Sequence, residues 1–379
     1  MKTVYMDQCA TGWPKHPRYL EVMDQIRNDP GIINHRSGID MVRLGYELLD
    51  KLIAHFDIPS HFKIPYREII FTRGATEGLN VAANLPSLPP SPVPGRQPFF
   101  VDSYAHNAQF APHVEDFEFP LTNFQIMRDS FAVHPRPGTV VLFNLKNNFG
   151  MTPAHRFTEA SIDLVSDCRV ILDASQWIHW GSRISDLPIE SLVSRGNEVI
   201  LVFGFHKGLK LDSGFGILMR FSADGNGVDE LLRAEIGGQG GLDAFTSLLD
   251  YSYSKFPSGT FDPRPYVALH AMLDHSEELR MPAVKDPEAV RLFDRIFQFM
   301  KSHDAHYDVN HDGPTSIASY WHEDRSLSEL TSLLRDYLLQ TEPDIEPIYR
   351  VGKFCCNLYF DYVVSRESNE KDGRIRISI

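Results

Sequence analysis

Two short sequences place an acid and a lysine directly after stretches that are rich in Val, Ile and Leu. The first, Asp-Ala-Ser-Gln at residues 173–176, follows the apolar residues 169–172. The second, Phe-Gly-Phe-His-Lys at residues 203–207, follows residues 198–202. Both apolar stretches are typical of buried strands. A lysine that forms a Schiff base and an acid that keeps a pyridine nitrogen protonated are the two groups that pyridoxal phosphate needs, so this pair predicts a pyridoxal phosphate enzyme.

A third sequence is typical of a phosphate site. Residues 73–78 read Arg-Gly-Ala-Thr-Glu-Gly and join a predicted strand at 68–72 to a predicted helix at 76–85. Small residues let the backbone approach an anion, and the first amides of a helix, here that of Ala75, favour phosphate. Thr76 adds a hydroxyl donor. The alternative is an ordinary strand-to-helix turn with a threonine cap.

The single residues also have simpler interpretations. Asp173 is equally typical of a helix cap or a surface acid. His206 is expected to help hold the phosphate, or to be a core histidine. Lys210 is a weaker candidate than Lys207 for the Schiff base. His106 follows another strand-like stretch, where its ring is expected to stack on the pyridine face or to lie in an ordinary loop.

Cys355 and Cys356 are adjacent in a predicted strand at residues 353–358, so their side chains point to opposite faces and only one can face a cofactor. A nucleophilic thiolate there would need a lowered pKa, which a cation such as Arg350 or Lys353 would supply. A buried structural thiol is the commoner role. The His- and Asp-rich residues 303–312 are interpreted as a polar loop, and no metal site is predicted because the spacing is not that of zinc ligands.

The predicted fold class is α/β. Strands and helices alternate over the first 260 residues or so, which favours a mostly parallel sheet covered on both faces, with ligands at the carboxyl ends of its strands. Longer helices after residue 263 indicate a smaller α+β domain. The predicted division is a large domain of residues 15–262 and a small domain of residues 1–14 and 263–379. The remaining predicted helices lie at 18–27, 41–56, 266–273, 288–300 and 327–339, and the remaining strands at 98–101, 139–144 and 215–219.

Composition bounds the possible partners. The formal net charge of the 379 residues is −13, which argues against nucleic acid and anionic membranes. Hydrophobic residues make up 42% and charged residues 23%, as in soluble globular proteins. The chain has no apolar run of the roughly 18 to 20 residues that a membrane helix needs, and its start does not resemble a signal peptide. Its 4 cysteines do not form a disulfide framework, and a cytoplasmic location is expected.

In order along the chain, these motifs resemble the class V aminotransferase-fold enzymes, specifically the cysteine desulfurase and selenocysteine lyase group. Residues 5–11 (Tyr-Met-Asp-Gln-Cys-Ala-Thr) are similar to the opening segment of the family, and residues 71–80 to its phosphate-binding turn. The resemblance implies that Lys207 forms the Schiff base, that Asp173 pairs with the pyridine nitrogen, and that His106 stacks on the ring.

Further matches extend the implied site. Asn147 and Gln176 are expected near the phenolic oxygen of the cofactor, with Asn147 also contacting substrate. Thr260, in Ser-Gly-Thr, matches the residue that reaches the phosphate of the neighbouring subunit, which implies a homodimer with shared sites. Residues 350–355 (Arg-Val-Gly-Lys-Phe-Cys) resemble the segment that presents the persulfide-forming cysteine, so Cys355 is the candidate nucleophile and Arg350 a substrate neighbour. Arg376 resembles the arginine that binds the substrate carboxylate.

The sequence departs from the family at three places. First, Gly204 stands where a phosphate-binding serine is common. Second, the residues after Lys207 lack the usual glycine-rich pattern, and an insertion is expected around residues 180–197. Third, Phe354 replaces the histidine before the cysteine, and the terminal helices usual after Arg376 are not present. The predicted function is a desulfurase-like enzyme that acts on cysteine or a cysteine-like amino acid and passes sulfur to an acceptor protein. A C–S β-lyase, another class V reaction (transamination, epimerisation or oxidative deamination), and an inactive sulfur-relay protein remain alternatives.

Overall fold

A computed structural model describes residues 2–32, 40–59, 69–85, 99–102, 124–127, 135, 137–146, 165–223, 262–281, 285–311, 315–352 and 374–379. The predicted site residues His106, Asn147, Thr260, Cys355 and Cys356 lie outside these ranges, as does the predicted strand at 353–358. Among the described helices, none combines the length and the apolar run that crossing a membrane requires.

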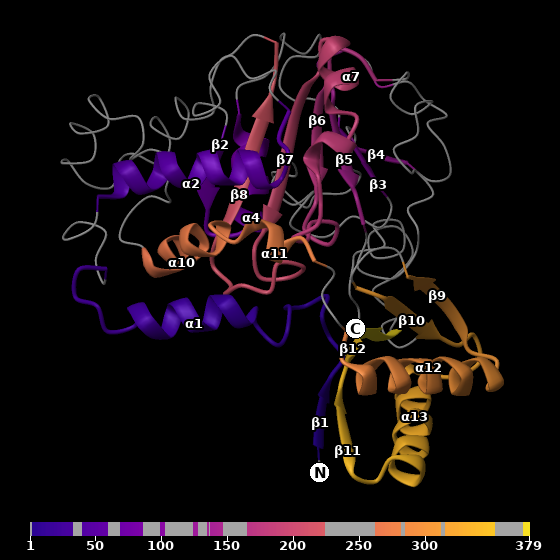
Figure 1. The fold of residues 1–379 in the computed structure, drawn as a ribbon. Coiled ribbons are helices and arrows are strands. Elements are labelled where there is room, and N and C mark those ends of the chain that lie inside the picture. Colours follow the sequence, from indigo (N-terminus) through magenta and orange to yellow (C-terminus); the bar gives the residue numbers. More distant parts are fainter. Residues whose placement is uncertain are drawn as a thin grey trace.

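The larger part of the molecule is built on a seven-stranded sheet (Figure 1). Its strand order is β2-β8-β7-β6-β5-β3-β4. Strands β3 to β7 all pair in parallel, and β8 pairs antiparallel with both β7 and β2. This confirms the predicted α/β class with a mostly parallel sheet. The strands are β2 Ile69–Thr72, β3 Phe99–Asp102, β4 Phe124–Met127, β5 Val140–Asn144, β6 Arg169–Asp173, β7 Glu198–Gly204 and β8 Gly216–Phe221.

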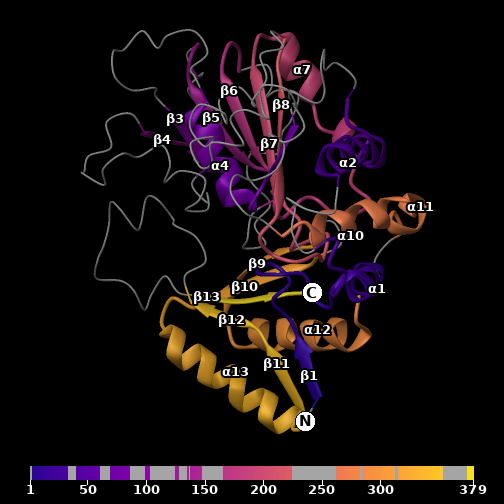
Figure 2. The same ribbon diagram turned by 90° about the vertical axis from the view of Figure 1, so that its left-hand side faces the viewer.

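Helices cover both faces of this sheet, which is why its central strands are buried along their whole length. Alternate residues such as Leu201 and Phe203 belong to a core that also contains α1 (Pro17–Ile26), α2 (Met41–His55) and α10 (Arg264–Leu273). Helix α4 (Ala75–Asn84) packs against the strands from the other side (Figure 2). A Cβ at Gly78 of α4 would lie 2.6 Å from Val202 Cγ1, so the glycine permits this close approach.

At the amino ends of these strands, one buried carboxylate is shared by two arginines. Glu198 at the start of β7 bonds to Arg169, its register partner on β6, and to Arg220 of β8 at 2.5 Å. All three side chains are at most 7% exposed. Arg169 Nη1 also donates to the carbonyl of Leu85 after α4, at 2.8 Å. The group lies at the edge of the sheet opposite Asp173 and ties three strands together.

A second core lies in the lower part of Figure 1 and is built on a four-stranded antiparallel sheet. The strand order is β12-β13-β10-β9, and helices α12 and α13 pack on one face. Strand β1, at the N-terminus, pairs in parallel with β11 beside this unit. The elements are β1 Lys2–Tyr5, α12 Pro287–Ser302, β9 His306–Asn310, β10 Ile317–Trp321, α13 Leu327–Thr341, β11 Ile345–Ile348, β12 Arg350–Gly352 and β13 Arg374–Ser378.

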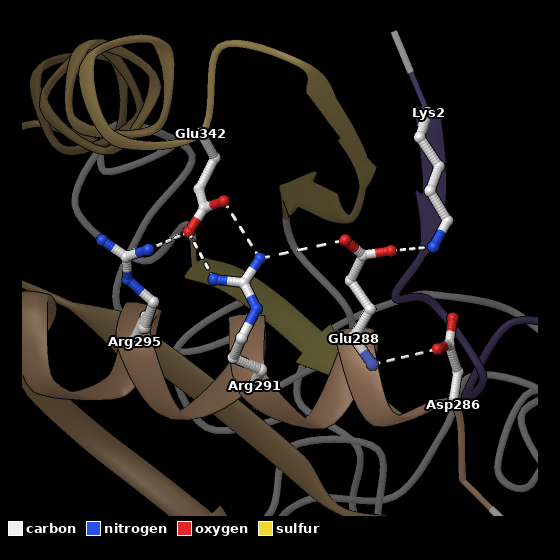
Figure 3. A network of polar contacts seen from close by, with 6 residues as sticks. All are labelled: Lys2, Asp286, Glu288, Arg291, Arg295 and Glu342. Carbon is white, nitrogen blue, oxygen red and sulfur yellow. Dashed lines mark hydrogen bonds and ion pairs between the residues drawn. The ribbon is translucent and has the colours of Figure 1, made fainter.

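Ion pairs hold the N-terminal strand to this second unit (Figure 3). Lys2 of β1 bonds to Glu288 in the first turn of α12, and Arg291 on the same helix lies 3.9 Å from Glu288 and 2.6 Å from Glu342. Glu342 follows α13 and also bonds to Arg295. Two arginines therefore share one carboxylate that is only 10% exposed, which fixes the end of α13 against α12.

Two sequence expectations about this region need comment. The prediction of a polar loop over residues 303–312 is wrong for its centre, because His306–Asn310 forms strand β9 and pairs with β10. The division at residues 262 and 263 stays a prediction. In the packing, α10 and α11 (Ser276–Leu279) contribute to the first core, and the second core contains Val4 and Met6 and then residues from Ala289 onward.

The first core encloses a neutral histidine. His55 is 1% exposed, with Nε2 2.9 Å from the carbonyl oxygen of Trp180 and Nδ1 2.8 Å from Oγ of Ser276. Burial lowers the pKa of His55 from its usual 6.5 to about 4. The neutral ring thus contributes its full stabilisation above pH 6.5, the pKa in the unfolded chain, and loses it progressively as the pH falls toward 4.

We therefore expect the melting temperature to fall between pH 7 and pH 5, and to fall less in the variant His55→Gln. Glutamine can donate to the Trp180 carbonyl but does not titrate. Other buried histidines also contribute, so the measured quantity is the difference between the two pH profiles. Parallel profiles for the wild type and the variant would contradict the assignment.

Candidate active site

The structure brings Asp173 and Lys207 to the same edge of the central sheet. Strands β6 and β7 are adjacent and parallel, and Asp173, the last residue of β6, pairs in register with Val202. Lys207 lies in the turn that directly follows β7. Asp173 is 6% exposed, and its Oδ1 accepts a hydrogen bond from the amide of Ser175 at 2.9 Å. The sequence prediction that the two strand ends are neighbours is confirmed by this pairing.

The electrostatics of the turn favour Lys207 over its rival Lys210. Burial lowers the pKa of Lys207, and among the described residues Asp173 is the strongest group that opposes this shift. For Lys210, burial lowers the pKa, and no described carboxylate offsets it. A buried amine that loses its proton readily is suited to act as a nucleophile or a base. Asp173 is therefore coupled to Lys207 in particular.

Beside this turn, the start of α4 and the end of β7 bring together groups that can bind an anion. Helix α4 begins at Ala75, so the amides of its first turn lack helical partners. A Cβ at Gly204 would lie 3.1 Å from Nδ1 of His206 and 3.5 Å from the amide nitrogen of Ala75. A side chain at this position would crowd both groups, so the glycine lets a ring nitrogen and a helix N-terminus lie close together. Thr76 lies in the same first turn.

The His206 ring is suited to donate a hydrogen bond to an anion near the start of α4. Nδ1 is buried, and it has no hydrogen-bond partner among the described parts of the chain. Burial lowers the pKa of His206 to about 4, so the ring is neutral at physiological pH and carries one N–H. A phosphate group bound there would receive hydrogen bonds from the ring and from the amides of α4. These residues therefore fit the phosphate of the predicted cofactor.

Arg376 is held at the site by an acid from the N-terminal segment. Its guanidinium is 2% exposed within β13 and bonds to Oδ1 of Asp7 at 2.7 Å. Arg350 of β12 is the register partner of Arg376, and both arginines help to lower the pKa of Lys207. The two predicted substrate-binding arginines thus lie next to each other and within electrostatic reach of the lysine.

Residues 7–12 connect these groups. The amide of Cys9 donates to Oγ of Ser378 in β13, at 2.9 Å, and the carbonyl of Cys9 accepts from Nε2 of Gln176, also at 2.9 Å. Three residues further on, the amide of Gly12 donates to the carbonyl of His206 at 2.7 Å. The segment is therefore bonded both to the strand that carries Arg376 and to the turn that carries Lys207.

Sequence reasoning missed two residues of this site. Cys9 is 2% exposed and is hydrogen-bonded to both Ser378 and Gln176. Burial raises the pKa of its thiol, opposed by Arg376, Ser378, Lys207 and Lys146. Lys146 follows β5, is 6% exposed, and donates from Nζ to the carbonyl of Thr315 at 2.8 Å. The sequence could have indicated both as site residues, since Cys9 lies within the opening motif and Lys146 directly precedes Asn147.

No family model and no curated protein matches the chain. Solved structures do. The apo cysteine desulfurase of Thermococcus onnurineus NA1 superposes with a TM-score of 0.62 at 16% identity, covering 99% of this chain and 89% of that one. DndA from Streptomyces lividans gives 0.58 at 16% identity, with 96% of each chain covered. The chain has the fold of the class V aminotransferases.

A fold neighbour with a different reaction is also similar. The phosphoserine aminotransferase SerC from Cytophaga hutchinsonii gives a TM-score of 0.56 at 14% identity, covering 99% of this chain and 92% of that one. The resemblance read from the motifs is thus confirmed for the fold. Because both kinds of enzyme share it, the reaction has to be argued from the residues of the site.

The contact between the N-terminal segment and the lysine turn leads to a prediction. A Cβ at Gly12 would lie 2.2 Å from the carbonyl oxygen of Lys207. We therefore expect Gly12→Ala to displace the segment from the turn and to lower the melting temperature by several degrees. Gly31→Ala is the matched control, because the added Cβ would meet only a side-chain oxygen of Asp29 at 3.2 Å. Equal melting temperatures for the two variants would contradict this packing.

Proposed function

We propose that the protein is a pyridoxal phosphate-dependent enzyme that cleaves the C–S bond of cysteine or a cysteine-like amino acid. The observation that carries the proposal is the pairing of β6 with β7, which sets a buried acid and a partly buried lysine at one sheet edge. The unpartnered Nδ1 of His206 and the start of α4, groups suited to bind a phosphate, are next to that lysine and support the same conclusion.

When bound, the cofactor supplies an electron-accepting ring for the charge that develops at the substrate Cα. Ala75, Thr76 and His206 would hold its phosphate, and Gln176 its phenolic oxygen. Asp173 would keep the proton on the pyridine nitrogen. Each of these roles uses a polar atom at the carboxyl edge of the sheet or at the start of α4.

The remaining steps belong to residues of this chain. Arg376, oriented by Asp7, would bind the substrate carboxylate with its planar guanidinium. Lys207 would then remove the proton from Cα, a role favoured because burial lowers the pKa of its amine.

Two outcomes for the sulfur remain, and desulfuration is the one we favour. In that reaction Cys355 attacks the substrate sulfur and keeps it as a persulfide for an acceptor protein, leaving alanine. The cysteine desulfurases among the fold neighbours support it. In a β-lyase the sulfur group leaves unaided and the products are pyruvate and ammonia. Replacement of the usual histidine by Phe354 is the observation that keeps this reaction open. A homodimer that contributes Thr260 across its interface is part of the same proposal.

Cofactor binding is tested by colour and by covalent trapping. Purified protein supplied with pyridoxal phosphate is expected to absorb visible light, and borohydride reduction should fix the cofactor on the peptide that contains Lys207. The variant Lys207→Ala should give no adduct, whereas the control Lys210→Ala should retain it. A colourless wild type without an adduct would favour the non-enzymatic relay protein.

The reaction is tested by product analysis with cysteine. With an added thiol that reduces the persulfide, alanine and sulfide are expected from the wild type, and Cys355→Ser should lower alanine production at least tenfold, since the persulfide can no longer form on that residue. Cys356→Ser is the matched control and should keep the wild-type rate. Pyruvate in place of alanine, or undiminished alanine from Cys355→Ser, would exclude the desulfurase mechanism.

A further inference from the structure

The four-stranded sheet of the second core has one apolar face and one polar face. Ala318 and Tyr320 of β10, with Ile375 and Ile377 of β13, belong to the core under α12 and α13. Alternate residues of the same strands therefore lie on the opposite face. On that face the register gives one row across the sheet, in the order Arg350, Arg376, Ser319, Asp308.

Ser319 is the unusual member of this row. Its side chain is 0% exposed, and Oγ has no hydrogen-bond partner among the described residues. Its neighbours in the row are engaged: Arg376 bonds to Asp7 at 2.7 Å, and Asp308 bonds to Arg374 at 2.5 Å. A buried hydroxyl without a partner destabilises a folded protein, and alanine would avoid that cost. Ala318, the preceding residue of β10, shows that the strand accommodates alanine.

Other buried serines near this sheet have partners. Ser378 of β13 accepts a hydrogen bond from the amide of Cys9, and Ser316, just before β10, accepts one from Lys285 Nζ at 2.7 Å. Ser319 differs from these two serines because its hydroxyl has no partner among the described residues. It lies directly across from Arg376. Cross-strand partners in an antiparallel pair have Cβ atoms about 5 Å apart. Ser319 and Arg376 are therefore neighbours on the same face of the sheet.

We propose that the Ser319 hydroxyl donates a hydrogen bond to the substrate carboxylate that Arg376 binds. The inference rests on the proposed function, because it takes Arg376 as the carboxylate site. A carboxylate offers about four lone-pair positions, and a bidentate guanidinium uses two of them. Ser319 then fills a third position from the neighbouring strand. Because the Ser319 hydroxyl is buried, it gains a hydrogen-bond partner only when a carboxylate is bound, which would favour substrates that have one.

If Ser319 has this role, its substitution should affect substrate binding but not the stability of the ligand-free protein. Ser319→Ala removes a buried hydroxyl that lacks a partner, so the melting temperature of the ligand-free protein should stay the same or rise. The KM for cysteine should increase about tenfold, as expected for a lost hydrogen bond to a charged group, with kcat little changed. Cysteamine, which lacks the carboxylate, should perturb the visible spectrum of the pyridoxal phosphate-loaded variant and wild type at equal concentrations.

Two further variants complete the test. Ser319→Thr keeps the hydroxyl and should restore most of the affinity for cysteine. Ser316→Ala removes a hydroxyl that has a partner, so it should lower the melting temperature without changing KM. A merely structural serine at 319 would give an unchanged KM for Ser319→Ala, or equal weakening of cysteine and cysteamine, and either result overturns the proposal.

The increase in melting temperature caused by L-alanine, with ethylamine as the control, provides a measurement that does not depend on turnover or on the cofactor. Saturating alanine should stabilise wild type more than Ser319→Ala, whereas ethylamine should stabilise neither. If the protein binds no pyridoxal phosphate but keeps this difference, the proposed function fails and the role of Ser319 stands. If alanine stabilises both proteins equally or neither, the inference about Ser319 is wrong.

Discussion

The site depends on hydrogen bonds made by six residues of the N-terminal segment. At one end Asp7 holds Arg376 and the amide of Cys9 holds Ser378, so the segment follows the small sheet. At the other end the amide of Gly12 is bonded to the carbonyl of His206, next to Lys207. These bonds set the distance between the guanidinium that would hold a substrate and the amine that would act on it. A substrate-binding strand and a catalytic turn from different cores are thereby made one unit.

The charges around Lys207 are unevenly distributed. Arg376, Arg350 and burial all favour the neutral amine, and Asp173 favours the ammonium. Near Cys9, Lys146 adds another cation. An excess of positive charge attracts an anionic substrate, and it also raises the fraction of Lys207 that is neutral and able to accept a proton. The neutral His206 ring contributes a hydrogen-bond donor near this group without adding charge, since burial lowers its pKa to about 4. Binding and proton transfer are thus served by one set of residues.

Much of this arrangement follows from local sequence. Continuous apolar runs predicted β6 and β7 to within two residues, because strands covered on both faces must be apolar throughout. Strand β9 was missed because the His- and Asp-rich residues 303–312 were interpreted as a polar loop, although Tyr307 and Val309 alternate with polar residues as in a half-exposed strand. Strands β1 and β11 are short and pair across most of the chain, so no local pattern indicates them. The burial of Cys9 depends on Ser378, which no spacing rule brings near it. Gly204 was interpreted as a missing phosphate donor, whereas the geometry adds that a side chain there would crowd His206 and the start of α4.

The shared carboxylate of Glu198 has a consequence for the opposite edge of the sheet. If β7 shifted by one residue along β6, Glu198 would leave Arg169, and an unpaired charge would remain in the interior, a change that costs several kcal/mol. The same slip would rotate every side chain of β7 to the other face and carry the lysine turn one step away from Asp173. The ion pairs of Glu198 with Arg169 and Arg220 thus fix the register of the strands. Substitutions at Arg169 or Arg220 would displace Lys207 relative to Asp173, although neither arginine is part of the site.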